Sequence, residues 1–308
     1  MKIIDTHIHL YDFKKGRPGA SHMQPLGYGK VCRSEKQGRI APPSFADCTS
    51  SPEILLEYMD WCGVEKGILM SNPYYGYFNG YVKEAVMKNP DRLRGVALVD
   101  VLKGRAAADE LEKIYQEGVL FGMAFETANT FMAKPEMHLG DSFLEPLWQC
   151  MNAYKQPAFI HMFTGTDIED VEILSEDYPD IKFILCHLGA DAVWGANAGP
   201  DGLAKLYEIA AGRENVFVDL SSIPDYLDEE YPFPTAVRRI QDAWNKIGAQ
   251  KMLWASDYPG MLTQATYKQL INLVLKECRE IPMRDKELIM GLNAEHLLFE
   301  QNEKEEKL

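Results

Sequence analysis

The feature that most constrains the fold of this chain is a regular alternation of short apolar runs with longer amphipathic segments. Runs rich in Ile, Val, Leu and Phe favour strands, and segments with helical periodicity between them favour crossover helices that make consecutive strands parallel. Eight runs are predicted as strands: 2–9, 66–71, 93–100, 119–126, 157–162, 182–187, 215–220 and 251–256. The alternation therefore predicts an α/β protein.

Eight strands that are each followed by a helix are typical of a closed (β/α)8 TIM barrel, and an open doubly wound sheet is the alternative. An open sheet normally carries a glycine-rich phosphate loop after its first strand, but here the chain reads His-Ile-His-Leu-Tyr-Asp. Barrels of roughly 250 residues or more usually form one domain. We therefore expect residues 1–308 to form a single barrel domain with a polar tail at 300–308.

One connection is much longer than the others. Roughly 40 residues with many Gly, Pro, Ser and charged side chains, at about 10–50, separate the first strand from the first helix. Connections of this length are usually functional or disordered. This one follows a strand, and barrel enzymes build their sites at the C-terminal ends of the strands. The sequence therefore predicts a long active-site loop.

Composition limits the partners and the compartment. A net charge of −14 argues against nucleic acid or an anionic membrane, because both are bound by clustered Lys and Arg. The six cysteines form no CxxC pair, which suits a reducing compartment. The chain shows no signal peptide, and no apolar stretch approaches the length of a membrane span. We expect a cytoplasmic protein that acts on a small-molecule substrate.

Histidines gather at the predicted strand ends. His7 and His9 lie two residues apart at the end of the first strand, so both side chains face the same side, which we expect to be the barrel lumen. His161, His187 and Asp257 stand at the ends of the fifth, sixth and eighth strands. The strands of a barrel converge on one opening, so four of the seven histidines are predicted to meet there with a carboxylate.

A group of three histidines and one aspartate is typical of a metal site. The mixed nitrogen and oxygen ligands of His7, His9, His161 and Asp257 suit Zn²⁺ best, also fit Mn²⁺, Fe²⁺ or Co²⁺, and do not suit Ca²⁺. On a rigid barrel such a site leaves a coordination position open to water or substrate, as catalytic metal sites do. The predicted cofactor is one divalent metal.

Five short segments occur in an order that resembles a known family. They are Asp5-Thr-His-Ile-His9, Ile160-His161, Cys186-His187-Leu-Gly189, Ala255-Ser-Asp257-Tyr-Pro259 and Gly291-Leu-Asn-Ala294. Together they resemble the amidohydrolase-related family of the amidohydrolase superfamily, in the branch that includes aminocarboxymuconate semialdehyde decarboxylase. The resemblance spans nearly the whole chain but leaves out the long first loop and the middle.

The resemblance implies a role for each matching residue. His7, His9, His161 and Asp257 would bind the metal, and His187 would lie beside it as the acid/base or polarising group. The wider superfamily often has a carboxylated lysine at the end of the fourth strand. Here that strand ends with Glu126, which favours a single metal and a supporting role for this carboxylate. Relatives in this family are commonly dimers, so the resemblance also allows a homodimer.

Two reactions and one binding function use such a site. A metal lowers the pKa of water from 15.7 to about 7, and His187, with a pKa of about 6.5, and Asp257 would move protons. These parts favour a hydrolase that cleaves a small ester, lactone or amide through a metal-activated water. The alternative is a non-oxidative decarboxylase of a small aromatic or unsaturated acid. A metal-binding sensor barrel without turnover is the third hypothesis.

Further side chains are expected around the substrate. Among the basic residues of the long loop, Arg33 and Arg39 are favoured for binding a carboxylate. Asn72 and Tyr74 follow the second strand, and Phe163 follows the fifth. Polar and aromatic groups in these positions would flank a small cyclic substrate. Behind the ligands, Asp5 is predicted to face the lumen and to orient a neighbouring imidazole.

Overall fold

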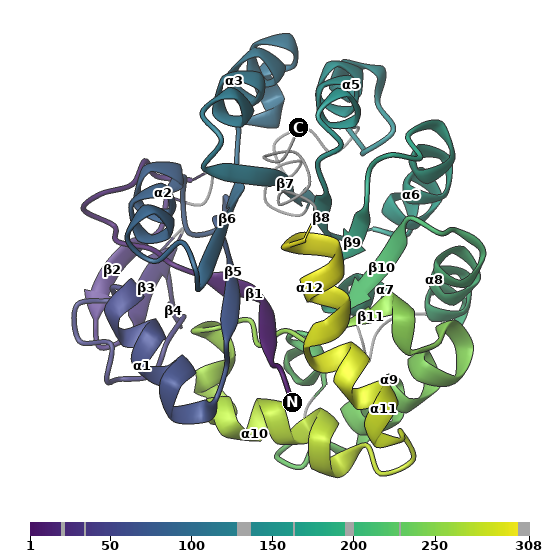
Figure 1. The fold of residues 1–308 in the computed structure, drawn as a ribbon. Coiled ribbons are helices and arrows are strands. Elements are labelled where there is room, and N and C mark those ends of the chain that lie inside the picture. Colours follow the sequence, from purple (N-terminus) through teal and green to yellow (C-terminus); the bar gives the residue numbers. More distant parts are fainter. Residues whose placement is uncertain are drawn as a thin grey trace.

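The computed structural model describes residues 1–19, 22–33, 35–127, 137–162, 164–194, 200–227 and 229–300, with the backbone alone for residues 191–194 and 200. Eight parallel strands form one sheet whose order follows the chain, and helices surround the ring (Figure 1). The strands are β1 (Ile4–His9), β5 (Lys66–Met70), β6 (Leu93–Ala97), β7 (Leu120–Glu126), β8 (Ala158–His161), β9 (Phe183–Leu185), β10 (Val216–Asp219) and β11 (Met252–Leu253). The predicted TIM barrel is confirmed.

The ring closes between β1 and the segment that continues β11. The backbone N–H of Thr6 donates to the carbonyl of Trp254 at 3.3 Å. The N–H of Asp257 donates to the carbonyl of His7 at 3.0 Å, and a further parallel bridge joins Ile8 to Tyr258. This pairing of the first strand with the last excludes the open doubly wound sheet.

Most of the helices follow the strands as predicted. The α-helices of the described residues are α1 (Pro52–Cys62), α2 (Asn79–Lys88), α3 (Arg105–Gln116), α5 (Glu145–Ala153), α6 (Gly165–Asp177), α7 (His187–Trp194), α8 (Pro200–Gly212), α9 (Pro234–Ile247), α10 (Tyr267–Asn272), α11 (Met283–Glu287) and α12 (Asn293–Leu298). Helix α1 begins where the Ser51 side chain accepts a hydrogen bond from the N–H of Ile54, and it ends at Gly63 in the left-handed conformation. Local capping chemistry thus sets its ends.

The sixth strand and its helix differ from the sequence prediction. Strand β9 ends at Leu185, and His187 adopts a left-handed backbone conformation (φ 56°) where α7 begins. The run 182–187 was therefore predicted too long, and α7 was not predicted. The consequence for the site is that a turn, rather than an extended strand, sets the direction of the His187 side chain.

Every strand contributes at least one apolar side chain to the interior of the barrel, namely Ile4, Ile68, Met70, Val96, Phe121, Ala124, Phe159, Ile184, Phe217 and Leu253. Ala294 and Leu298 of α12 belong to the same buried cluster, and α12 lies across the ring of strands (Figure 1). Lys66 at the start of β5 donates to Glu295 of α12 at 3.0 Å, so α12 covers the end where the strands begin. Polar side chains collect at the opposite end.

An irregularity in β1 changes which face its first residues occupy. The pairing of β1 with β5 shifts register between Asp5 and Ile8, as at a β-bulge. Ile4 lies in the interior cluster, whereas Asp5 accepts hydrogen bonds from the Tyr267 hydroxyl of α10 (2.6 Å) and from the N–H of Ser256 (2.9 Å). The prediction that Asp5 faces the lumen and orients an imidazole is wrong.

The segment 10–50 contains regular structure that the sequence did not predict. Strands β2 (Gln24–Gly27), β3 (Lys30–Arg33) and β4 (Lys36–Arg39) form a small antiparallel sheet beside α1 (Figure 1). Backbone hydrogen bonds from Tyr28 to Ala46 (2.8 Å) and from Tyr11 to Ser50 (3.3 Å) tie the segment to itself. The long connection is therefore a small sheet rather than a plain loop.

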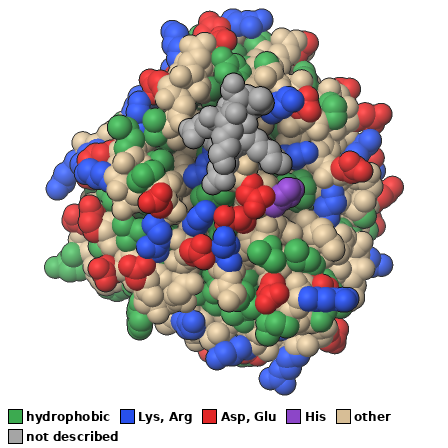
Figure 2. Space-filling model, viewed as in Figure 1, with side chains coloured by type: hydrophobic (Ala, Val, Ile, Leu, Met, Phe, Trp, Pro, Cys, Tyr) green, Lys and Arg blue, Asp and Glu red, His purple; other side chains and the backbone are tan. Residues whose placement is uncertain are grey.

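Two surface properties complete the description. No helix in the described part of the chain is long and apolar enough to cross a membrane. On the face that Figure 2 shows, which is the face over α12, acidic and basic side chains are interspersed among the residues described there. The tail residues 301–308 lie outside the described residues.

Candidate metal centre

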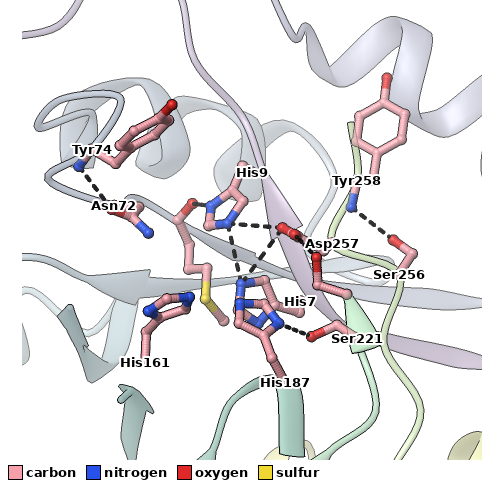
Figure 3. A network of polar contacts seen from close by, with 12 residues as sticks. His7, His9, Asn72, Tyr74, His161, His187, Ser221, Ser256, Asp257 and Tyr258 are labelled. Atoms are coloured by element: carbon pink, nitrogen blue, oxygen red, sulfur yellow. Dashed lines mark hydrogen bonds and ion pairs between the residues drawn. The ribbon is translucent and has the colours of Figure 1, made fainter. Parts of the chain in front are cut away.

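Three donor atoms from His7, His9 and Asp257 converge where the strands end. Nε2 of His7 lies 3.1 Å from Nε2 of His9. Oδ1 of Asp257 lies 3.2 Å from Nε2 of His9 and 3.9 Å from Nε2 of His7. Strand β1 supplies both imidazoles, and the three side chains point toward one another (Figure 3). The predicted HxH pair and the predicted carboxylate are thus brought together.

The outer nitrogens of both imidazoles are already bound to acceptors. Nδ1 of His7 lies 3.0 Å from Oδ2 of Asp219, and Nδ1 of His9 lies 3.1 Å from the carbonyl oxygen of Met70. A carboxylate and a carbonyl can only accept, so both Nδ1 atoms carry the proton of a neutral imidazole. Both neutral imidazoles then present the lone pair of Nε2 to each other and to Asp257, an arrangement that suits a cation among them.

A divalent metal fits these donors. Burial lowers the pKa of His9, although its contact with Asp257 raises it, so this imidazole resists a second proton. Burial also lowers the pKa of His7, but the charge and the hydrogen bond of Asp219 raise it above its ordinary value overall. Imidazole nitrogen and carboxylate oxygen are the donors that catalytic zinc sites combine with an open position. Both imidazoles are almost completely buried, so bulk water does not compete for the donors.

His161 does not belong to this converging group in the structure. Its Nε2 lies 3.2 Å from the hydroxyl of Tyr226, and its ring centroid lies 4.6 Å from that of His187. Its buried Nδ1 makes no hydrogen bond among the described residues, although it lies 3.4 Å from Oε1 of Glu126. The side chain of His161 stands beside the three donors rather than among them (Figure 3).

His187 lies between His7 and His161, with a ring centroid 4.6 Å from each. Its Nδ1 lies 2.6 Å from Oγ of Ser221, whose hydroxyl donates to Asp219. Because Ser221 has a single proton to give, its oxygen accepts from His187, and Nε2 is left as an acceptor. Burial and the neighbouring imidazoles lower the pKa of His187 to about 3, so the expected value near 6.5 is wrong.

Asp219 is a member of the site that sequence reasoning missed. It ends β10, is fully buried, and accepts hydrogen bonds from Nδ1 of His7 and from the backbone N–H of His187 (2.9 Å). Burial raises its pKa, but the charge and the hydrogen bond of His7 hold the pKa well below the ordinary value. An aspartate at the end of the seventh predicted strand was the available signal.

Asp257 is held as an anion on the other side of the imidazoles. The hydroxyl of Ser222 donates to its Oδ2 at 2.7 Å, while Oδ1 faces His9. Burial raises the pKa of Asp257, but the hydrogen bond to His9 and the charges of His187, His9 and His7 hold that pKa far below its usual range. An ionised carboxylate in this position is available as a metal ligand.

A cavity of about 400 Å³ opens over these groups. This size suits a small molecule. The predicted wall residues Arg33, Arg39, Asn72 and Tyr74 all line it, whereas Phe163 lies outside the described residues. Tyr75, which also follows the second predicted strand, lines it as well. Residues that the sequence did not single out complete the wall, namely Ser222, Asp225, Tyr226, Met261 and Thr263.

The small sheet brings two cations to the edge of the cavity. The guanidinium of Arg33 lies 4.8 Å from the ring centroid of Tyr74, whose N–H donates to the side chain of Asn72 at 2.7 Å. Arg39 donates to the carbonyl of Tyr28 at 2.7 Å, within the turn between β2 and β3. Positive charge therefore faces a cavity whose inner end is formed by imidazoles and a carboxylate.

Comparisons with known proteins agree with this architecture. A model of the Amidohydrolase family matches residues 4–299, so the chain belongs to this family. Gamma-resorcylate decarboxylase from Polaromonas sp. is 21% identical over 217 residues, a match that covers 59% of this chain and 64% of the relative. The chain thus spans less than two thirds of the length of that curated relative.

Solved structures with the same fold include two that extend over nearly the whole chain. A probable 2-pyrone-4,6-dicarboxylic acid hydrolase from Acinetobacter baumannii with bound citric acid has a TM-score of 0.70 and 17% identity, and the match covers 96% of this chain and 99% of the other. An amidohydrolase from Burkholderia multivorans with bound zinc has a TM-score of 0.71 and 16% identity, with 96% and 98% covered. At this identity the likeness shows the fold.

Proposed function

We propose that this protein is a metal-dependent hydrolase that cleaves a small ester, lactone or amide by attack of water. The observation that carries the proposal is the convergence of Nε2 of His7, Nε2 of His9 and Oδ1 of Asp257 beside a third imidazole, that of His187. The first three groups are donors that suit a divalent metal. The fourth group, the imidazole of His187, would act as a base beside these donors.

His7, His9 and Asp257 would hold one divalent ion. We propose His161 as the fourth ligand, because it lies on the cavity wall and its Nδ1 makes no hydrogen bond among the described residues. Zinc is favoured, and manganese, iron or cobalt are the other metals that suit these donors. A divalent metal polarises a carbonyl oxygen and makes water more acidic. The zinc in the Burkholderia multivorans amidohydrolase supports this assignment.

The side chains of the cavity supply the remaining steps. Nε2 of His187 accepts the proton of the attacking water, because its Nδ1 already donates to Ser221. Arg33 and Arg39 bind a carboxylate of the substrate at the outer end of the cavity. The citric acid bound to the Acinetobacter baumannii hydrolase supports a substrate with carboxylate groups.

Non-oxidative decarboxylation of a small aromatic or unsaturated acid is the second candidate, and the curated decarboxylase relative favours it. That reaction needs a group that donates a proton to the carbon losing CO₂. His187 lines the cavity and its Nδ1 lies 2.6 Å from Oγ of Ser221, so we infer that Nδ1 donates to Ser221 and that Nε2 accepts a proton rather than donating one. The inferred position of the proton on His187 therefore favours hydrolysis over decarboxylation.

The two reactions and the sensor hypothesis have different products. Zinc-loaded protein is incubated with lactones and esters that carry a carboxylate, and with hydroxybenzoate-type acids. Acid release is followed by pH-stat titration, and CO₂ by a coupled assay. We expect acid release from the first group and no CO₂ from the second. CO₂ without hydrolysis would support the decarboxylase, and neither product from any compound would support the sensor.

Replacement of His187 separates its role from metal binding. We expect His187→Ala to lower kcat by about 100-fold to 10,000-fold, the usual contribution of an acid–base group, and to keep the metal content unchanged. The matched control is His296→Ala, because His296 is an exposed histidine on α12. Wild-type turnover in the His187→Ala protein would show that another group accepts the proton.

A further inference from the structure

Asp219 uses both of its carboxylate oxygens inside the barrel. Oδ2 accepts a hydrogen bond from Nδ1 of His7 at 3.0 Å. Oδ1 accepts from the backbone N–H of His187 at 2.9 Å, from the backbone N–H of Ser221 at 3.0 Å, and from the Ser221 hydroxyl. Asp219 therefore binds the proposed metal ligand His7 with one oxygen. With the other oxygen it binds the backbone of the proposed base His187 and the neighbouring Ser221.

Ser221 carries this contact to the His187 ring. Its Oγ lies 2.6 Å from Nδ1 of His187, and its single proton is directed to Asp219, because a carboxylate accepts and does not donate. The backbone N–H of His187 binds the same carboxylate. The path His7–Asp219–Ser221–His187 is thus continuous, and each hydrogen bond fixes the direction of the next.

Burial leaves this network few alternatives. The four side chains are each no more than 3% exposed, so water does not replace a lost partner from the surface. If the Ser221 hydroxyl turned toward His187, Asp219 would lose a donor in a buried environment, which costs more than it would in water. The protein therefore favours one arrangement of protons over the alternatives.

We propose that Asp219 and Ser221 are positioning residues that fix the tautomers of His7 and His187 together. The inference deepens the proposed function and rests on it. Through Oδ2, the carboxylate makes Nε2 of His7 a metal-binding atom. Through Ser221, it makes Nε2 of His187 the proton-accepting atom that faces the substrate. One buried anion thereby prepares both the ligand and the base.

Three substitutions test the contact of Asp219 with His7 and the contact of Ser221 with His187 separately. Ser221→Ala removes the acceptor of His187 but leaves His7 bound to Asp219, and Ser221→Thr keeps a hydroxyl. Asp219→Asn disturbs both links. Ser175→Ala is the matched control, since Ser175 is also a buried serine with one hydrogen bond, to the carbonyl of Glu172 at 3.0 Å. Each protein is labelled with ¹⁵N, and the His187 signals are assigned by comparison with His187→Gln.

The imidazole ¹⁵N shifts report the tautomer, independently of activity. We expect the wild type, Ser221→Thr and the control to show a protonated Nδ1 at His187, and Ser221→Ala to show a population with the proton on Nε2. With zinc saturating, kcat of Ser221→Ala falls by about tenfold or more, while KM and zinc affinity stay the same. Asp219→Asn also weakens zinc binding by about 10- to 100-fold, as loss of a partner behind a metal ligand does.

The outcomes also separate this inference from the proposed function. A wild-type His187 with its proton on Nε2, or a Ser221→Ala protein with unchanged tautomer and unchanged kcat, overturns the inference. Normal tautomers in a wild type that hydrolyses no substrate overturn the proposed function alone. If Asp219→Asn fails to fold, the comparison of Ser221→Ala with Ser221→Thr still decides.

Discussion

At the scale of single residues, the four proposed ligands differ in how completely the fold prepares them. His9 contributes a lone pair that already points at two other donors, whereas Nε2 of His161 contacts Tyr226. We therefore expect His9→Ala to lose zinc during purification. We expect His161→Ala to bind one zinc with lower affinity. Elemental analysis measures the first change, and titration with a competing chelator measures the second.

The control for these substitutions is His296→Ala, because the imidazole of His296 is exposed on α12, at the end of the barrel opposite the site. It should keep the zinc content and affinity of the wild type. A His9→Ala protein that matches this control would contradict the metal centre itself. An unchanged affinity in His161→Ala would leave the three converging donors in place and remove His161 from the ligand set.

The residues that the sequence identified share a local signal. His7, His9, His161 and Asp257 stand at or just after the ends of apolar runs, and a barrel brings all such ends to one opening. The alternation of strand side chains was less reliable, because the irregularity in β1 turned Asp5 away from the lumen. The positions of the protons on the His187 ring could not be predicted from the sequence either. They depend on hydrogen bonds to Asp219 and Ser221, which lie more than 30 residues away along the chain.

At the scale of elements, the small sheet should act on substrate binding rather than on the reaction. We expect Arg33→Ala to raise KM about tenfold for a substrate with a carboxylate, the loss expected from one charge-assisted hydrogen bond, with little change in kcat. KM for a neutral ester should stay the same. Steady-state kinetics on a matched pair of charged and neutral substrates measures both effects.

Lys36→Ala is the comparison within the same sheet, because Lys36 is an exposed cation of β4 that does not line the cavity. It should leave both KM values unchanged. An equal loss with the charged and the neutral substrate in Arg33→Ala would mean that the arginine supports the sheet or Tyr74 rather than the substrate. The carboxylate assignment would then be wrong.

The elements themselves were predictable where burial gives them a pattern. Most of the barrel strands are apolar because both faces are buried, so they appear in the sequence as apolar runs. Strands β2 and β4 are almost entirely exposed and have four residues each, so no alternation reveals them. The turn Gly27-Tyr28-Gly29, with positive φ at all three residues, was the available signal.

At the scale of the whole molecule, α12 closes the barrel at the end opposite the site. Leu298 is 1% exposed and packs in the interior cluster, whereas Leu292 in the preceding turn is 45% exposed. We expect Leu298→Ala to lower the free energy of unfolding by about 2–5 kcal/mol, and Leu292→Ala by no more than about 0.5 kcal/mol. Urea unfolding measures both, and an equal effect would show that α12 does not close the core.

Two ion pairs join Glu295 of α12 to the barrel. Glu295 lies 3.2 Å from Nζ of Lys2, which precedes β1, and 3.0 Å from Nζ of Lys66, which begins β5. Burial raises the pKa of Glu295, but the hydrogen bonds and charges of the two lysines lower it below its ordinary value. A lowered carboxyl pKa contributes stability that is present above the unfolded pKa of about 4.3 and is lost as the pH falls through the folded value.

Glu295→Gln should therefore lower the free energy of unfolding by about 1 kcal/mol at pH 7, and the difference from the wild type should shrink as the pH falls below about 4. The matched control is Glu84→Gln, because Glu84 pairs with Lys88 in full exposure on α2 and should contribute much less. Urea unfolding of the three proteins across this pH range measures the difference. A difference that persists unchanged at low pH would mean that Glu295 acts through packing rather than through its charge.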